Sequence, residues 1–316
     1  MKKILFVLLI LTSFLQTSCS PDPIDNSPIT NPVDVYVAGS KNNQACYWKN
    51  NQLVILDTNG LPSTYATKII VSNGDVYVLG YGGDATVFYT LFWKNGVLTN
   101  LNTAFNTVGL YINDFDVVSN DVYIVGYARN FPANGYNFGY WKNGVRTILN
   151  NNTPDFNPSY IKVLNNDVYT SINFPTQGYY INTTYHDTPN KTNNGLINYG
   201  NEMYVYGGFS LSGFYYNTSN NTNTNISFPN DGSITNMSFD NNNTYYTNNK
   251  AIYKNGNTLV PETAINFITD FEVQNNNLYI ITNIIGSQSQ YVTLNNTIVL
   301  SNASNERFYS LYVVQN

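Results

Sequence analysis

Charged residues are scarce in this chain of 316 residues, at 10% of the total. Its 19 acidic residues outnumber its 14 basic ones, which gives a formal charge of −5. A protein that binds nucleic acid needs a basic surface to neutralise phosphates, so this balance excludes nucleic acid as a partner. So few charges also argue against long, charged surface helices.

Histidine and cysteine are almost absent as well. The single histidine, His186, precedes Asp187 in a segment that we expect to be a loop, as a solvated side chain rather than half of a catalytic dyad. Cys46 lies in a predicted strand, where a lone thiol acts as a small buried hydrophobe. No Cys/His spacing suits zinc, and no Gly-Lys-Ser loop suits a phosphate. We therefore expect no metal, no cofactor and no catalytic residue of these classes.

The N-terminus carries the marks of a targeting signal. Lys2 and Lys3 precede an apolar run over residues 4–11 that is too short to span a membrane. The segment that ends at Cys19 resembles a bacterial lipobox, although Gln16 stands where an aliphatic residue is usual. That resemblance implies a signal peptide over residues 1–18 and a lipid on Cys19. The alternative is a plain secretory signal.

Residues 19–33 are rich in Pro, Asp, Asn and Ser, a composition that cannot bury a core and predicts a flexible tether. Asp22 and Asp25 follow the cysteine closely and resemble the export signals of surface lipoproteins of Bacteroidota. The predicted location is the cell envelope. The lipid would anchor the protein in the outer membrane, on its periplasmic or its outward side.

What the chain has in abundance is tyrosine, 28 residues, and two short phrases that recur seven times each. The first is Asp-Val-Tyr-Val-x-Gly or a weaker form of it, with its Tyr at residues 36, 77, 123, 169, 204, 245 and 279. The second is Trp-Lys-Asn-Gly or a weaker form of it, with its first residue at 48, 93, 141, 181, 216, 253 and 294.

Each pair of phrases predicts a unit of β-strands. The first phrase has the β-branched and aromatic residues of a strand that ends at glycine. The second places Asn-Gly between two apolar runs, which predicts a type I′ turn joining a third and a fourth strand, with Trp packed against the neighbouring unit. A further strand precedes each first phrase, as in residues 68–71, 115–118 and 161–164.

The two ends of the chain complement each other. Only the predicted tether precedes the first phrase, whereas residues 309–314 form a spare strand at the C-terminus. A closed ring needs such an exchange, so residues 34–316 are predicted to form an all-β propeller with seven four-stranded blades. The last blade would join the C-terminal strand to the strands of residues 34–57. An open β-solenoid is the alternative, and residues 182–257 carry the weakest pattern.

These phrases resemble those of the propeller-type lipoproteins of flavobacteria, in which Asp-Val-Tyr-Val-x-Gly alternates with Tyr-Trp-Lys-Asn-Gly. The resemblance covers residues 34–316 and is sharpest in the first three units. It implies a propeller in the cell envelope and implies no activity.

Carboxylates in the predicted innermost strands are the main candidates for a ligand site. Asp114 and Asp116 occupy the same places in their unit as Asp270 and Glu272 do in theirs, and residues two apart share a face of a strand. Two more candidates, Lys162 and Tyr312, occupy in their own units the position that is equivalent to that of Asp116. Such a ring could hold water, Ca²⁺ or a polar ligand. Alternatively, the carboxylates hydrate the channel mouth or pair with Lys68 and Lys162.

Other repeated polar and aromatic residues have simpler explanations. The aspartates that open the first phrase stand at turns, where they would bond to the local backbone rather than to a metal: Asp34, Asp75, Asp121 and Asp167. Paired tyrosines at 179–180, 215–216 and 245–246 could stack on sugars, but we expect them in the core.

Two functions fit these expectations. The first is a non-enzymatic binding module that holds a protein or a glycan. The second is a carbohydrate-active enzyme, a glycoside hydrolase or lyase, that uses the channel carboxylates as acid and base. An enzyme of this kind needs two carboxyl groups about 5 to 9.5 Å apart in an open cleft. A buried or salt-bridged set would count against it.

Overall fold

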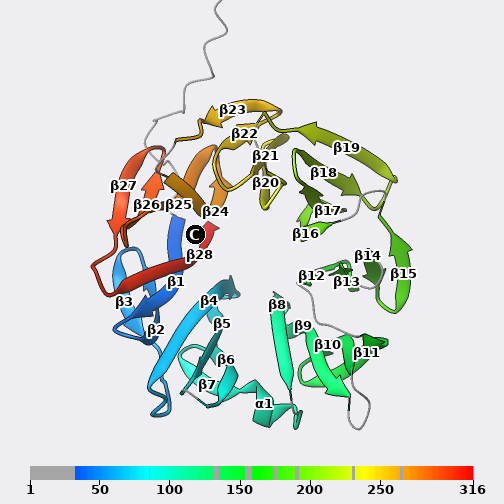
Figure 1. Ribbon diagram of the computed structural model, residues 1–316, viewed down its shortest axis with the longest axis vertical. Coiled ribbons are helices and arrows are strands. Elements are labelled where there is room, and N and C mark those ends of the chain that lie inside the picture. Colours follow the sequence, from blue (N-terminus) through cyan, green and yellow to red (C-terminus); the bar gives the residue numbers. More distant parts are fainter. Residues whose placement is uncertain are drawn as a thin grey trace, which may run out of the picture.

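The strands of the computed structural model form seven four-stranded antiparallel sheets around one axis (Figure 1). The structure describes residues 33–84, 86–107, 109–130, 135–153, 159–173, 177–188, 192–229, 232–263 and 266–315. The predicted signal peptide, Cys19 and all but the last residue of the predicted tether lie outside these ranges. Within them, no helix has the length and apolarity that crossing a bilayer requires. The predicted seven-bladed propeller is confirmed, and the open solenoid was the wrong alternative.

Each blade runs from an innermost strand beside the axis to an outermost strand, and we number the blades by their innermost strands in chain order. Blade 1 contains β4 (Ser63–Ser72), β5 (Asp75–Gly83), β6 (Phe88–Lys94) and β7 (Val97–Asn100). The short helix α1 (Leu101–Ala104) leads to blade 2, which contains β8 (Leu110–Val118), β9 (Asp121–Asn130), β10 (Gly135–Lys142) and β11 (Val145–Thr153). Blade 3 contains β12 (Ile161–Leu164), β13 (Asp167–Ile172), β14 (Gly178–Ile181) and β15 (Thr184–Asp187).

The remaining blades repeat this order, including the part of the chain with the weakest sequence pattern. Blade 4 contains β16 (Asn193–Tyr199), β17 (Glu202–Phe209), β18 (Ser212–Asn217) and β19 (Thr222–Ser227). Blade 5 contains β20 (Asn236–Asp240), β21 (Asn243–Thr247), β22 (Ile252–Lys254) and β23 (Asn257–Val260). Blade 6 contains β24 (Asn266–Gln274), β25 (Asn277–Ile284), β26 (Gln290–Leu294) and β27 (Thr297–Ser301). Blade 7 contains β28 (Glu306–Gln315), β1 (Val33–Lys41), β2 (Gln44–Lys49) and β3 (Gln52–Ile55).

Blade 7 closes the ring with strands from both ends of the chain, as predicted. The C-terminal strand β28 pairs antiparallel with β1, and the register places Tyr312 opposite Tyr36. An ion pair of 3.0 Å between Lys41 and Glu306 lies at one end of this ladder. The closure therefore consists of main-chain hydrogen bonds and needs no covalent link.

The recurring Lys-Asn-Gly phrase forms the turn between the third and fourth strands. In blade 1, Asn95 and Gly96 have φ angles of 50° and 81°, the pair of positive values that a type I′ turn requires. The Asn95 side chain accepts the Val76 backbone N–H at 2.8 Å and donates to the Asp75 carboxylate at 2.8 Å. Lys94 also reaches Asp75, at 2.8 Å. The two phrases recur together because their side chains bind each other across neighbouring strands.

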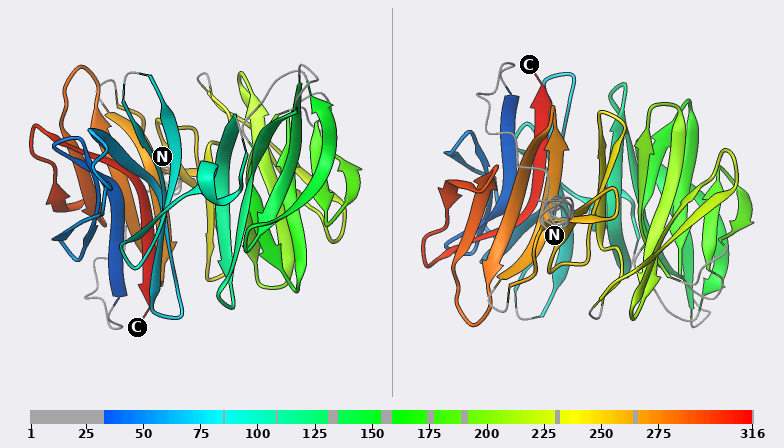
Figure 2. Two further views of the ribbon diagram at one scale, coloured as in Figure 1. Left: turned by 90° about the horizontal axis from the view of Figure 1, so that it is seen from below. Right: turned by 90° about the horizontal axis from the view of Figure 1, so that it is seen from above.

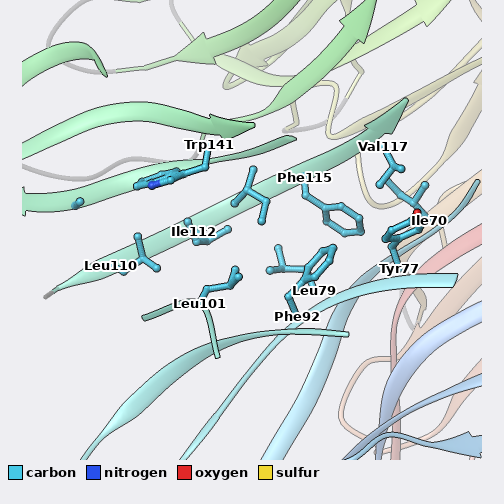
Figure 3. Close-up of a cluster of buried hydrophobic side chains, with 12 residues drawn as sticks. Ile70, Tyr77, Leu79, Phe92, Leu101, Leu110, Ile112, Phe115, Val117 and Trp141 are labelled. Atoms are coloured by element: carbon cyan, nitrogen blue, oxygen red, sulfur yellow. The ribbon is translucent and has the colours of Figure 1, made fainter. Parts of the chain in front are cut away.

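The hydrophobic core lies between the blades. Figure 3 shows the cluster between blades 1 and 2, in which Tyr77 and Phe92 of blade 1 face Phe115 of blade 2. The Phe92 and Phe115 rings meet edge to face with centroids 5.3 Å apart. Trp93 packs instead toward blade 7 and donates its indole N–H to the Asp57 carbonyl at 2.7 Å. Both faces of a sheet are therefore covered, and for this reason adjacent tyrosines such as Tyr245 and Tyr246 are both buried, as expected of core residues.

The propeller, which Figure 2 shows edge-on, has two unlike faces. One face carries the turns that join first to second and third to fourth strands, such as residues 73–74 and 95–96, and we call it the turn face. The other carries the connections from second to third strands and from blade to blade, such as residues 42–43 and 302–305, and we call it the loop face. Val33, the first described residue, pairs with Gln315 at the turn face. The N-terminal segment therefore joins the propeller on the side opposite the loop face.

Candidate functional site

The innermost strands bring the predicted polar residues into a ring around the axis. In every blade the innermost strand pairs with the recurring Tyr of the second strand, so the register identifies equivalent positions. Seven residues, one from each blade, lie opposite this Tyr: Ile70, Asp116, Lys162, Ile197, Ser238, Glu272 and Tyr312. The predicted equivalence of Asp116, Lys162, Glu272 and Tyr312 is confirmed.

A second ring lies two residues earlier along the innermost strands. Six of its members are Lys68, Asp114, Gly195, Asn236, Asp270 and Ser310. In five of these strands the register shifts by one residue directly before the ring, as it does between Ile112 and Asp114. Such β-bulges re-aim side chains, and proteins often place them next to functional sites.

The carboxylates of both rings bind the backbone of the following blade. On β8, Asp114 accepts the Ile161 N–H at 3.0 Å and Asp116 accepts the Val163 N–H at 2.9 Å, both donated by β12. The same arrangement recurs between β24 and β28. There Asp270 accepts the Leu311 N–H at 2.7 Å. Glu272 accepts the Val313 N–H at 2.8 Å.

These hydrogen bonds satisfy the free edges of the innermost strands. An innermost strand has a neighbour in its own sheet on one side only, so alternate N–H groups on its other side lack a ladder partner. Acidic side chains of the preceding blade accept two such donors on β12 and two on β28, one donor for each side chain. Through these four hydrogen bonds, the acidic side chains tie neighbouring blades together near the axis.

The charges of the rings are only partly balanced. Lys68 forms a short ion pair with Asp114, and Lys162 lies 3.3 Å from Asp116. No ion pair within 4.0 Å involves Asp270 or Glu272 among the described residues. Burial raises the pKa of Asp270 to about 6, against the hydrogen bonds from Leu311 and Phe271 that lower it. Burial, and then the charge of Asp270, raises the pKa of Glu272 to about 8, so Glu272 is mostly protonated at neutral pH.

The other residues that we considered for catalysis or metal binding take part in packing or in local hydrogen bonds. His186 lies on the outermost strand β15 and stacks on Tyr179, with ring centroids 5.2 Å apart, so the expected loop position was wrong. Cys46 is fully buried, as expected, and burial raises the pKa of its thiol to about 12. The Asp121 carboxylate accepts a hydrogen bond from the Asn143 side chain at 2.7 Å. We had expected this carboxylate to bond to the local backbone instead. Among the described residues, no three His, Cys, Asp or Glu side chains are grouped closely enough to hold a metal ion.

A partly exposed group of aromatic residues on the loop face was missed by the sequence analysis. Tyr65 lies at its centre, with ring centroids 6.1 Å from Tyr309, 5.8 Å from Tyr81 and 6.1 Å from Phe88. Tyr81 donates to the Ile112 carbonyl, which links this group to blade 2. We call Tyr65, Tyr81, Phe88 and Tyr309 the aromatic cluster. All four residues lie outside the repeated phrases, although Tyr81 directly follows one of them, and no pattern in the sequence connects them.

The aromatic cluster is part of a wider difference between the faces. Of the large apolar side chains that are exposed among the described residues, eight lie on the loop face: Val87, Phe88, Tyr111, Phe209, Leu211, Phe267, Ile285 and Tyr309. The remaining six lie on outermost strands: Leu53, Ile55, Val97, Val145, Ile148 and Ile298. The turn face carries asparagine-rich turns instead. Exposed apolar groups that gather on one face are typical of a binding surface.

Comparison with known proteins supports the fold alone. No family model matches the chain, and no curated protein sequence is similar to it. Among solved structures it resembles a quinonprotein alcohol dehydrogenase-like protein from Bacteroides thetaiotaomicron (TM-score 0.56, 12% identity, 88% of this chain and 77% of that one). It also resembles apo AztD from Citrobacter koseri (TM-score 0.50, 9% identity, 90% and 98%). The acylaminoacyl peptidase of Pyrococcus horikoshii matches 88% of this chain over 50% of its own length (TM-score 0.51, 12% identity). At identities this low, the structural similarity shows a shared propeller fold and gives no information about activity.

Proposed function

We propose that this protein is a non-enzymatic binding module of the cell envelope, anchored by a lipid on Cys19, whose loop face binds a glycan. The exposed aromatic rings on that face carry the proposal. Phe88 is 59% exposed and Tyr309 37% exposed, although both contact other rings of the aromatic cluster. A soluble domain gains stability by burying such rings, so their joint exposure favours a role in binding, where flat aromatic surfaces stack on apolar faces of a ligand.

The position of the anchor agrees with this orientation. The chain joins the propeller at Val33 on the turn face, and the predicted tether over residues 19–33 would lead from there to the bilayer. A lipid on Cys19 would therefore leave the loop face pointing away from the membrane. Labelling of growing cells with a radioactive fatty acid tests the anchor. The wild-type protein should incorporate the label and Cys19→Ser should not, and a labelled Cys19→Ser variant would contradict it.

The alternative is a carbohydrate-active enzyme that uses the carboxylates near the axis. Its best support is the pair on β24, because Asp270 with a pKa of about 6 and Glu272 with a pKa of about 8 differ as an acid and a base do. However, each of these side chains accepts a backbone N–H of β28, and Asp114 and Asp116 are engaged in the same way and paired with lysines. This engagement favours a structural role. Ligand binding by these residues, with Lys162 and Tyr312, remains a prediction.

A glycan array probed with the chain downstream of Cys19 tests the proposed function. Binding to a defined class of glycans that Tyr65→Ala lowers at least severalfold is the expected result. Silence on all glycans would contradict glycan binding and point to a protein ligand. The proposed function predicts that no bound glycan is cleaved, so any cleavage that is detected should be measured again in the folded variant that combines Asp116→Asn with Glu272→Gln. A loss of cleavage would favour the enzyme instead.

A further inference from the structure

We infer that the loop face holds a subsite for an acidic sugar, a uronate or a similar carboxylate-bearing residue of a glycan, formed by blade 7 and the adjoining parts of blades 6 and 1. This inference rests on the proposed function and specifies its ligand. The subsite is a cavity of about 620 Å³ whose lining includes Tyr65, Tyr309, Arg307, Asn43 and Gln288. Cavities of roughly 300 to 1,000 Å³ hold small ligands, whereas protein partners usually dock on larger and flatter surfaces. A recess of this size matches a small ligand such as one or two sugar residues.

Arg307 provides the charge of the subsite. Its Nη1 donates to the Glu306 carbonyl at 2.9 Å and lies 3.4 Å from the Gln288 carbonyl, so backbone acceptors hold the guanidinium in place. The Glu306 carboxylate pairs with Lys41 instead, at 3.0 Å. Among the described residues, no carboxylate lies within 4.0 Å of Arg307. A half-buried guanidinium without an acidic partner is suited to a carboxylate from outside, which it can bind through two parallel N–H groups.

The two tyrosines provide the stacking surface. Their ring centroids lie 6.1 Å apart at an interplanar angle of 49°. Tyr309 is the extra residue of the β-bulge in β28, because Phe308 pairs with Gly39 and Ser310 with Ala38. A Cβ atom at Gly39 would lie 1.9 Å from the Arg307 carbonyl oxygen, so the close approach of β1 requires glycine there. The bulge thus places an exposed aromatic ring and an unpaired arginine side by side at the loop face.

Neutral polar groups complete the cavity. The side-chain amides of Asn43 and Gln288 make no hydrogen bond to any described residue, and they lie in the lining beside Ser63. Amides and hydroxyls match the alternating donors and acceptors of sugar hydroxyl groups. An acidic peptide would instead require several cations, and this cavity is lined by one. The combination of stacking rings, neutral amides and one arginine therefore favours an acidic sugar over an acidic peptide.

Calorimetric titration of the chain downstream of Cys19 with trigalacturonate tests this inference. The fully methyl-esterified trimer serves as the neutral analogue and a short poly-glutamate peptide as the acidic competitor. We expect trigalacturonate to bind at least about tenfold more tightly than either probe, as one charge-assisted bidentate contact allows. Arg307→Gln should remove this preference for the acid, and Arg307→Lys should restore only part of it.

Arg129 offers a matched control, because it is an exposed arginine on the loop face, next to Tyr136 of blade 2 and outside the cavity. Arg129→Gln should leave trigalacturonate affinity unchanged. Equal affinities for the acid and its ester, an unchanged affinity in Arg307→Gln, or tighter binding of poly-glutamate would each overturn the inference. Binding of neutral glycans on the array with no response to trigalacturonate would overturn the acidic subsite alone. Silence on the array would overturn the proposed function as well.

Discussion

Asp116 and Val163 belong to neighbouring blades, and the carboxylate of the first accepts the backbone N–H of the second at 2.9 Å. The two residues lie 47 positions apart in the chain, about one blade. The carboxylate also lies 3.3 Å from the Lys162 ammonium group. One side chain thus satisfies a free strand edge and a cation, and it joins two sheets that share no main-chain ladder.

Asp116→Ala should destabilise the propeller by about 2 kcal/mol, because it leaves a backbone donor without its acceptor and a lysine without its counter-charge. Urea denaturation measures the change. Asp116→Asn is the control, since its amide oxygen can still accept the Val163 N–H, and it should cost less than half as much. Equal costs for the two variants would show that the hydrogen bond contributes little.

Glu272 should make the folded protein less stable as the pH rises, the opposite of the usual effect of an acidic residue. Its pKa is about 8 in the folded protein against an ordinary value of 4.5, so the folded state binds the proton more tightly. The resulting stabilisation is complete below pH 4.5 and is lost as the pH rises through 8. Glu272→Gln removes the titration, so the variant should gain on the wild type between pH 5 and pH 9 in urea denaturation. Parallel stability curves for the two proteins would contradict the raised pKa.

Asn143 should be sensitive to substitution although it lies in an exposed turn. Its φ angle is 48°, and its side chain accepts the Val122 N–H at 2.9 Å and donates to Asp121 at 2.7 Å. Asn143→Ala should cost about 1 to 2 kcal/mol, through the strained φ and the lost hydrogen bonds. Asn143→Gly keeps the favourable φ and should cost less. Thermal denaturation orders the three proteins, and a glycine variant less stable than the alanine variant would contradict this account.

Removal of residues 306–316 should prevent the ring from closing. Blade 7 would lose β28, and β1 would expose the main-chain groups that now pair with residues 306–315. An exposed strand edge of this length favours association, so we expect oligomers or aggregates in size-exclusion chromatography. A synthetic peptide of residues 306–316 should restore part of the monomer. A truncated chain that stays monomeric and folded without the peptide would show that closure is dispensable.

The number of blades, the turns and the closure of the ring could all be predicted from amino-acid patterns, because each blade repeats the same turn chemistry and the two ends of the chain complement each other. Asn95 and Gly96 adopt positive φ angles in any hairpin of this kind, and the spare strand at residues 309–314 had one place to pair. The partners of Asp114 and Asp270 could not be predicted, because their backbone donors belong to strands 47 and 41 residues away and are brought close only by the packing of neighbouring blades. The same holds for the aromatic cluster, whose residues come from different strands and lie together only because the blades stand side by side around the axis.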